Sequence, residues 1–220
     1  MLVTSRSYDE YAAMFDLDGA AVRGRVVDCC AGASSFVAEL AARGGVGVAV
    51  DPVYARGVDA VRRTAAESLV AGRAIVDDHA DRFVWDWYGR PERRDRLRAA
   101  AADRFLDDLA RRPFAYLAGA LPHLPLATGS ADLVLCSHLL FTWADRLDAG
   151  WHRAALADLV RVARREVRVF PLVVQATGAP VPFLDRLVDE LRALGHDADV
   201  RDVPYEFQRG AHAMLVIHRR

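Results

Sequence analysis

Short apolar runs that alternate with segments of helical periodicity are the feature that most restricts the fold of this chain. Arg25–Cys29 and Val46–Val50 have the composition of buried strands, and Phe36 and Leu40 lie between them at helical spacing. Buried strands separated by helices are typical of a mainly parallel sheet with helices on both faces. The length of 220 residues suits one such domain, so we expect a single domain over residues 1–220.

The same periodicities assign the remaining elements. We expect helices over Tyr8–Phe15, Ser35–Arg43, Ala149–Val162 and Phe183–Leu194, and strands over Ala115–Leu117, Ala131–Ser137, Glu166–Val174, Asp197–Val203 and Ala213–Arg219. The segment of about 71–112 is longer than a simple crossover requires. Because it contains an aromatic cluster and a helix start at Pro91, we interpret it as a helical insertion, or lid, over the ligand edge of the sheet. A peripheral hairpin that only adds stability is the alternative.

The composition excludes several classes of function. A net charge of −1 provides no basic field for nucleic acid or a membrane surface, and the apolar runs are too short to span a bilayer. The N-terminus lacks the apolar core of a signal peptide, and three cysteines fit a reducing cytoplasm, where we expect the protein to reside. Their spacing indicates no metal site. Every basic residue is arginine, which excludes Schiff-base chemistry and a P-loop lysine.

The loop after the first strand, Asp28–Phe36, is the candidate ligand site. Small residues follow the strand and a helix follows them, which is where open α/β sheets bind nucleotide-like ligands. Small side chains let the backbone approach a ligand, and the helix N-terminus is expected to offer free N–H donors. The dinucleotide fingerprint is absent, because Cys30 and Ser35 stand where two of its glycines would flank Gly32.

Two carboxylates accompany this loop. Asp28, at the tip of the first strand, would repel a pyrophosphate but suits a ligand that carries an ammonium group and a sulfonium. Asp51 ends the second strand, where an ionised carboxylate receives two ribose hydroxyls. The two positions together favour a nucleoside that bears an amino acid over a dinucleotide.

In these motifs the chain resembles class I S-adenosylmethionine-dependent methyltransferases. Val26–Gly32 is similar to the first motif of that family, a hydrophobic strand leading into Asp-x-x-x-Gly, and Asp51 falls at its ribose-binding acid. Leu121–His138 resembles the family's run into the fourth strand, and Leu159–Phe170 its passage from a helix to the fifth strand. The resemblance implies an α/β fold with a seven-stranded, mainly parallel, doubly wound sheet whose last strand, about Met214–Ile217, is antiparallel.

The resemblance also implies S-adenosylmethionine as cofactor, S-adenosylhomocysteine as product and methyl transfer to a small-molecule acceptor. The cofactor-binding residues that it implies are Asp28, Cys30, Ala31, Gly32, Ser34, Asp51, Pro52, Leu121 and Ser137. The chain departs from the family at Cys30 and Ser34, which replace glycines, and no acid follows the third strand to hold the adenine. Adenine recognition is then expected from backbone groups and apolar contact at Leu121.

Acceptor-side residues are expected near the fourth strand, in the insertion and in the last hairpin. His138 follows the fourth strand and is predicted to be a general base or a substrate contact, with a packed loop histidine as the alternative. Tyr88 is a second candidate for a catalytic group. The predicted substrate contacts are Trp85 and Trp87, whose π faces suit a sulfonium or a cationic substrate, and Glu206 and Arg209 from the last hairpin. Core packing is the alternative for the aromatic residues.

We expect a monomer or homodimer that acts on a small molecule and binds neither nucleic acid nor membrane. Two alternatives stay open. One is an RNA or protein methyltransferase on the same fold, against which stand the near-neutral charge and the absence of an Asn-Pro-Pro-Tyr-like motif. The other is a non-catalytic sensor or scaffold that binds S-adenosylmethionine, which the altered glycines favour.

Overall fold

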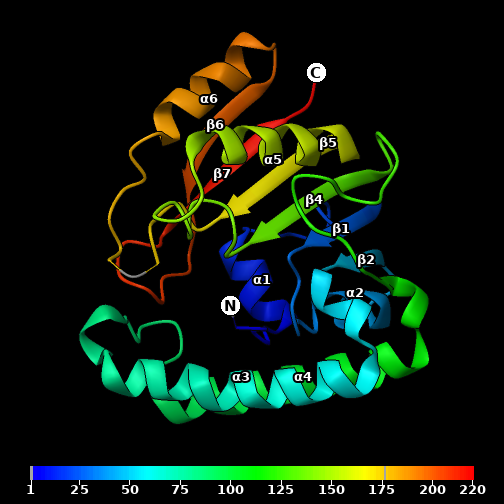
Figure 1. Ribbon diagram of the computed structural model, residues 1–220, viewed down its shortest axis with the longest axis vertical. Helices are drawn as coiled ribbons and strands as arrows, with labels where there is room; N and C mark the ends of the chain where they lie inside the picture. The colour runs from blue at the N-terminus through cyan, green and yellow to red at the C-terminus, as the bar shows by residue number, and fades with distance from the viewer. Residues whose placement is uncertain (1, 176) are drawn as a thin grey trace.

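A single sheet occupies the centre of the molecule, and the computed structural model describes residues 2–175 and 177–220. Its strands are β1 (Arg25–Cys29), β2 (Val46–Val50), β3 (Tyr116–Leu117), β4 (Ala131–Ser137), β5 (Ala163–Phe170), β6 (Asp197–Asp202) and β7 (Ala213–His218). They form a seven-stranded sheet in the order β3-β2-β1-β4-β5-β7-β6 (Figure 1). β1 to β5 are parallel, and β7 lies antiparallel between β5 and β6. The predicted fold class is confirmed.

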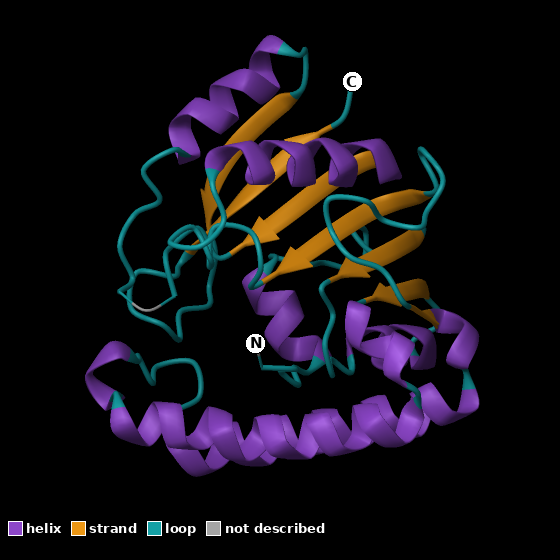
Figure 2. Cartoon of the chain, in the orientation of Figure 1, coloured by secondary structure: helices purple, strands orange, loops and turns teal. Residues whose placement is uncertain are grey.

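Helices cover both faces of this sheet, as Figure 2 shows. They are α1 (Tyr8–Met14), α2 (Phe36–Ala42), α3 (Val58–Asp78), α4 (Pro91–Arg111), α5 (Ala149–Val162) and α6 (Leu184–Ala193). Short 3-10 turns lie at Pro52–Arg56, Ala80–Arg82 and Pro113–Ala115. Among the described residues, no helix combines the length and the apolar character that a membrane crossing requires.

The central strands are buried on both sides, and their alternating side chains divide the core in two. Val26 and Leu135 pack in the hydrophobic cluster that includes α1 to α4, whereas Val27 and Cys136 pack in the cluster that includes α5 and α6. Burial on both faces explains why these strands have almost continuous apolar sequences. Because β1, β2 and β4 are parallel, the loops after them meet at one edge of the sheet.

α3 and α4 form a long helical hairpin beyond the carboxyl ends of the strands (Figure 1). The segment 71–112 contains the end of α3 and the whole of α4, which begins at Pro91 as expected. Buried side chains of the hairpin, among them Val61, Phe105 and Leu109, belong to the same hydrophobic cluster as α1 and α2. The hairpin therefore contributes to the core as well as lying beyond the carboxyl ends of the parallel strands.

Two elements differ from the sequence-based expectation. α3 begins at Val58, in a segment to which we assigned no element, because exposed apolar residues such as Val58 and Val70 obscure its periodicity. β5 covers Ala163–Phe170 rather than Glu166–Val174. It begins directly after α5, and it ends before Pro171, which has no N–H to donate to a neighbouring strand.

Candidate functional site

The loop that follows β1 uses its own backbone donors within the protein. Cys30 N and Ala31 N donate to the Val50 carbonyl, Gly32 N to Asp51 Oδ2, Ala33 N to the Thr4 carbonyl, Ser34 N to the Ala31 carbonyl, and Ser35 N to the Arg6 carbonyl. The expectation of free N–H donors is therefore wrong for these loop groups. An anion that approaches the loop must be bound by other donors.

The N-terminal segment covers this loop, and the closest approach is at Gly32. The φ of Gly32 is +57°, and a Cβ at this position would lie 3.2 Å from the Thr4 carbonyl oxygen. Cys30 also has a positive φ, of +63°, although it is not a glycine. The loop thus keeps the tight course of a glycine-rich loop, and Ala31 and Ser34 within it are buried.

Asp28 is a fully buried carboxylate at the tip of β1. Its Oδ1 accepts a hydrogen bond from the Tyr11 hydroxyl at 3.0 Å, whereas its buried Oδ2 has no partner among the described residues. Burial raises the pKa of Asp28 well above its ordinary value, and the nearby charge of Asp51 acts in the same direction. A buried carboxylate oxygen without a donor suits a ligand that brings a positive charge or N–H groups.

Asp51 follows β2 directly and is half-buried. Its Oδ1 accepts from Val53 N at 2.9 Å and its Oδ2 from Gly32 N at 3.0 Å, and burial raises its pKa. A carboxylate has about four lone-pair sites, so two are left to receive ribose hydroxyls. The Tyr54 hydroxyl donates to the Gly32 carbonyl at 2.7 Å and joins the loop to the turn after β2.

The remaining residues predicted to bind the cofactor lie around the same edge. Ser34 Oγ accepts from Phe36 N at 3.0 Å and stabilises the start of α2. Pro52 is exposed at the start of the turn after β2, and Leu121 is buried in the cluster that includes α5. Ser137 ends β4, and its Oγ lies 2.8 Å from the Nδ1 atom of His138.

Cys30 belongs to a cluster of three thiols. The Sγ atoms of Cys29, Cys30 and Cys136 all lie within 4.8 Å of one another, and Cys30 is the partly exposed member. The cluster forms because Cys29 and Cys136 are register partners on β1 and β4. Spacing along the sequence does not indicate it, since Cys136 is far from the other two in the chain.

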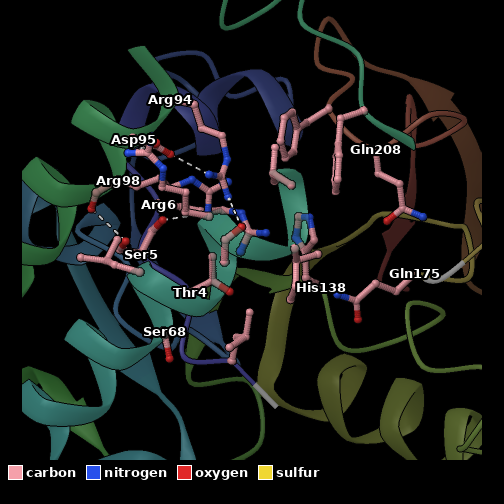
Figure 3. A pocket seen from close by; sticks show the side chains of 18 of the residues that line it. Thr4, Ser5, Arg6, Ser68, Arg94, Asp95, Arg98, His138, Gln175 and Gln208 are labelled. Atoms are coloured by element: carbon pink, nitrogen blue, oxygen red, sulfur yellow. Dashed lines mark hydrogen bonds and ion pairs between the residues drawn. The ribbon is translucent and has the colours of Figure 1, made fainter. Parts of the chain in front are cut away.

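A cavity of about 320 Å³ lies between the N-terminal segment, the α3–α4 hairpin and the ends of β4 and β5 (Figure 3). The hairpin side of its wall includes Leu69 and Val76, and the sheet side includes His138 and Phe170. The link between α3 and α4 also pairs with the connection between β6 and β7, where Val84 N donates to the Phe207 carbonyl at 2.7 Å. The cavity is thereby closed from several sides.

His138, a predicted catalytic residue, lines this cavity. It has a φ of +56°, and its backbone N–H donates to the Phe170 carbonyl at 2.7 Å, so the turn after β4 is fixed. Burial, with the positive charges of Arg6 and Arg98, lowers the pKa of His138 well below its ordinary value. The imidazole is therefore neutral at neutral pH, with one ring nitrogen that carries no proton, and it is a weaker base than an exposed histidine.

Tyr88, the second catalytic candidate, lies in a buried polar network rather than on the cavity wall. Its hydroxyl donates to Glu10 Oε1 at 2.5 Å, lies 3.0 Å from the Tyr205 hydroxyl, and accepts from Arg98 at 3.1 Å. The Arg98 Nε atom lies 3.0 Å from Glu10 Oε1. Burial alone would lower the pKa of Arg98, but Glu10 raises it above its ordinary value. Burial raises the pKa of Tyr88.

The predicted substrate contacts lie at the rim of the hairpin. Trp85 packs edge-on against Phe207, and Trp87 and Glu206 line a second hollow. Glu206 Oε1 accepts from Gly210 N at 2.7 Å, and Arg209 is exposed. The structure does not bring these four predicted contacts to the wall of the cavity that holds His138, as far as the residues it describes extend.

The sequence analysis missed several residues of that wall. They are Arg6, Arg94, Arg98, Phe170, Gln175, Tyr205, Phe207 and Gln208. They come from four separate parts of the chain, and no local pattern joins them. The sequence also gives no reason to single out Arg6 and Arg98, because every basic residue in it is an arginine and these two do not differ from the others.

Comparisons with known proteins agree with this architecture. No family model matches the chain. It is 22% identical over 219 residues to the uncharacterised protein MJ0045 of Methanocaldococcus jannaschii, and the alignment covers 99% of this chain and 96% of that protein. Magnesium protoporphyrin IX methyltransferase from Synechocystis, solved with bound S-adenosylmethionine, superposes with a TM-score of 0.51 at 15% identity, over 97% of this chain and 78% of that one.

The chain has the class I S-adenosylmethionine-dependent methyltransferase fold. A second solved structure with this fold is an O-methyltransferase of neocarzinostatin biosynthesis, in complex with S-adenosylhomocysteine and 1,4-dihydroxy-2-naphthoic acid. It superposes with a TM-score of 0.51 at 17% identity, over 97% of this chain and 53% of that one. The match extends over nearly the whole of this chain.

Proposed function

We propose that this protein binds S-adenosylmethionine and transfers its methyl group to a small-molecule acceptor in the cavity between the N-terminal segment and the α3–α4 hairpin. The observation that carries the proposal is a pair of carboxylates on adjacent strand tips, Asp28 and Asp51, at the same edge of the sheet as a cavity lined by His138. Two solved structures of the same fold hold the cofactor or its product, and one of them also holds a small aromatic acid.

The residues of the chain fit this cofactor. Asp51 has acceptor sites left for two ribose hydroxyls, and the unpartnered Oδ2 of Asp28 suits the amino group of the methionine part. Gly32 lets the backbone pass close to Thr4, where a Cβ atom at position 32 would make a close contact. Pro52 and Leu121 are the proposed apolar contacts of the adenosine.

When bound, the cofactor supplies a methyl group that its sulfonium already activates for transfer. The residues of the chain would then act mainly by positioning the acceptor and excluding water, and we assign the exclusion of water to the hairpin and the N-terminal segment, which line the cavity. We propose that His138 Nε2 accepts the proton that the acceptor loses. For this role Nδ1 carries the hydrogen and donates to Ser137 Oγ, 2.8 Å away.

Titration calorimetry with S-adenosylmethionine and S-adenosylhomocysteine tests the proposal. We expect both to bind with a Kd well below about 1 mM. Methyl transfer is then sought with a broad set of small acceptors, with mass spectrometry as the readout. Absence of binding by either nucleoside rejects the proposal, and binding without any methyl transfer favours a sensor or scaffold.

A variant of Asp51 tests the ribose assignment. Asp51→Asn keeps a carbonyl oxygen for the Val53 N–H but removes the charge that two hydroxyls would share. We expect S-adenosylhomocysteine to bind less tightly by about 1–3 kcal/mol. Asp107→Asn, a change at an exposed position of α4, is the matched control and should leave the affinity unchanged. An unchanged affinity for Asp51→Asn removes the ribose role.

A further inference from the structure

One positive charge in the cavity wall, that of Arg6, is not held in an ion pair by the described residues. Four arginines line the cavity, and the guanidinium groups of Arg6, Arg94 and Arg98 gather on one side of it in Figure 3. The fourth, Arg73, lies 3.4 Å from Asp95. Arg98 is paired with Glu10 at 3.0 Å, and Arg94 is paired with Asp95 at 2.8 Å. Within the described residues, Arg6 forms no ion pair, and its buried Nε has no hydrogen-bond partner.

The fold uses the backbone of Arg6 rather than its side chain. The Arg6 carbonyl accepts from Ser35 N at 2.9 Å and from Ser35 Oγ at 3.2 Å, bonds that any residue at position 6 would make. Burial and the charge of Arg98 lower the pKa of Arg6, and the nearby charge of Glu10 offsets only part of this effect. A bound anion would offset the cost of burying this charge.

The rest of the cavity suits an apolar molecule. Aromatic and aliphatic side chains such as Phe83, Phe170 and Phe207 make up much of the wall, and Gln175 and Gln208 lie across from the arginines (Figure 3). The volume of about 320 Å³ is at the lower end for small-molecule sites. The occupant is therefore small, mainly apolar and charged at one end.

We propose that the acceptor of this protein is a small apolar molecule with a carboxylate, and that the Arg6 guanidinium binds this carboxylate. Arginine is suited to this role because its planar guanidinium matches the two oxygens of a carboxylate. The inference rests on the proposed function, since it concerns the acceptor of that reaction. The inference adds a substrate class and a specificity-determining residue to the proposed function.

The methionine part of the cofactor also carries a carboxylate, and the loop N–H groups are not free to bind it. The position of Arg6 favours the acceptor. Arg6 lines the cavity together with Arg94 and Arg98, whereas Asp28, Gly32 and Asp51 do not line it. The two sources of a carboxylate are separated by measuring cofactor and acceptor binding independently.

The test uses calorimetry on the full chain saturated with S-adenosylhomocysteine. The probes are benzoate, 1-naphthoate and indole-3-acetate, each compared with its own primary amide, which has a similar shape but no charge. We expect at least one acid to bind about tenfold or more tightly than its amide, because hydrogen bonds between charged groups are the stronger ones. Arg6→Gln should remove this preference and leave the S-adenosylhomocysteine affinity within about twofold.

Arg96→Gln is the matched control, because it removes one positive charge from an exposed position of α4 and Arg96 does not line the cavity. It should retain the preference for acids. Equal binding of acids and amides, no binding of any acid, or a preference that persists in Arg6→Gln overturns the inference. A loss of S-adenosylhomocysteine affinity in Arg6→Gln assigns Arg6 to the cofactor carboxylate and also overturns it. If the wild-type protein binds no S-adenosylhomocysteine, the proposed function fails, and the acid–amide comparison without it still tests the anion site.

Discussion

The carboxylate of Asp28 is held in surroundings that oppose its charge, and this conflict has a measurable consequence. One of its oxygens is buried without a partner, and burial raises its pKa well above the ordinary value. When folding raises the pKa of a carboxyl group, the group stabilises the folded state fully at a pH below its pKa in the unfolded chain. This stabilisation is lost as the pH rises through the pKa of the group in the folded protein. The charge is thus a cost to the free protein, and it is retained at a position that suits the amino group of the cofactor.

Asp28→Asn removes this charge and keeps an oxygen that accepts from the Tyr11 hydroxyl. We expect the free protein to melt at a higher temperature, by about 2–4 °C for each 1 kcal/mol gained, and the gain to grow from pH 4 to pH 8. S-adenosylhomocysteine should bind about tenfold more weakly or worse. Thermal melts over this pH range and calorimetry measure both effects. A variant that is no more stable and binds normally contradicts both assignments of Asp28.

His138 has a pKa well below its ordinary value, through burial and the charges of Arg6 and Arg98. We expect its imidazole to titrate below pH 6.5 in nuclear magnetic resonance spectra, with the signal identified by its loss in His138→Gln. Once an acceptor is known, this variant should lose about 10²–10⁴ in kcat and keep its cofactor affinity. Titration of His138 near or above pH 6.5 contradicts the buried, neutral imidazole, and an unchanged kcat contradicts its role as base.

Among the elements, α1 and α4 are joined through one buried ion pair. Glu10 of α1 contacts Arg98 of α4, and the Tyr88 hydroxyl bridges this pair to Tyr205. Removing one partner of a buried ion pair leaves an uncompensated charge. Glu10→Gln is therefore expected to lower the free energy of unfolding by about 3–5 kcal/mol, measured by urea denaturation.

The double variant Glu10→Gln, Arg98→Met is the control for this prediction. It removes both charges, so it should recover part of the stability that Glu10→Gln loses. A single variant as stable as the wild type contradicts the structural role of the pair. Equal losses in the single and double variants attribute the effect to packing rather than to charge.

The elements also mark the limit of prediction from the sequence. Apolar strands that alternate with helices were enough to predict the parallel sheet, because periodicity is a local property of the sequence. The start of α3 was not predicted, since apolar residues such as Val70 lie on its exposed side. The cavity wall was not predicted either. Its arginines meet only in the folded chain, where Arg98 donates to the Ser5 carbonyl across 93 positions of sequence.

At the scale of the whole molecule, the α3–α4 hairpin is both a cover and a part of the core. A lid that merely rests on a finished domain would pack few of its side chains with the rest of the protein. Here Val61, Phe105 and Leu109 share one hydrophobic cluster with α1, α2 and the sheet. The hairpin and the N-terminal segment also enclose the cavity together, so stability and ligand binding depend on the same contacts.

The protein is therefore expected to unfold in one transition, with equal calorimetric and van't Hoff enthalpies. Replacing residues 71–112 with a short Gly-Ser linker should abolish cooperative melting, because it removes Phe105 and Leu109 from the core and exposes the partners they bury. Phe114→Ala is the control, since this exposed residue lies just outside the deletion and should leave the melt unchanged. A deletion variant that still melts cooperatively near the wild-type temperature would show the hairpin to be a dispensable lid. Saturation of the intact protein with S-adenosylhomocysteine at a hundred times its Kd should raise stability by about 2.7 kcal/mol, and the single transition should move as a whole.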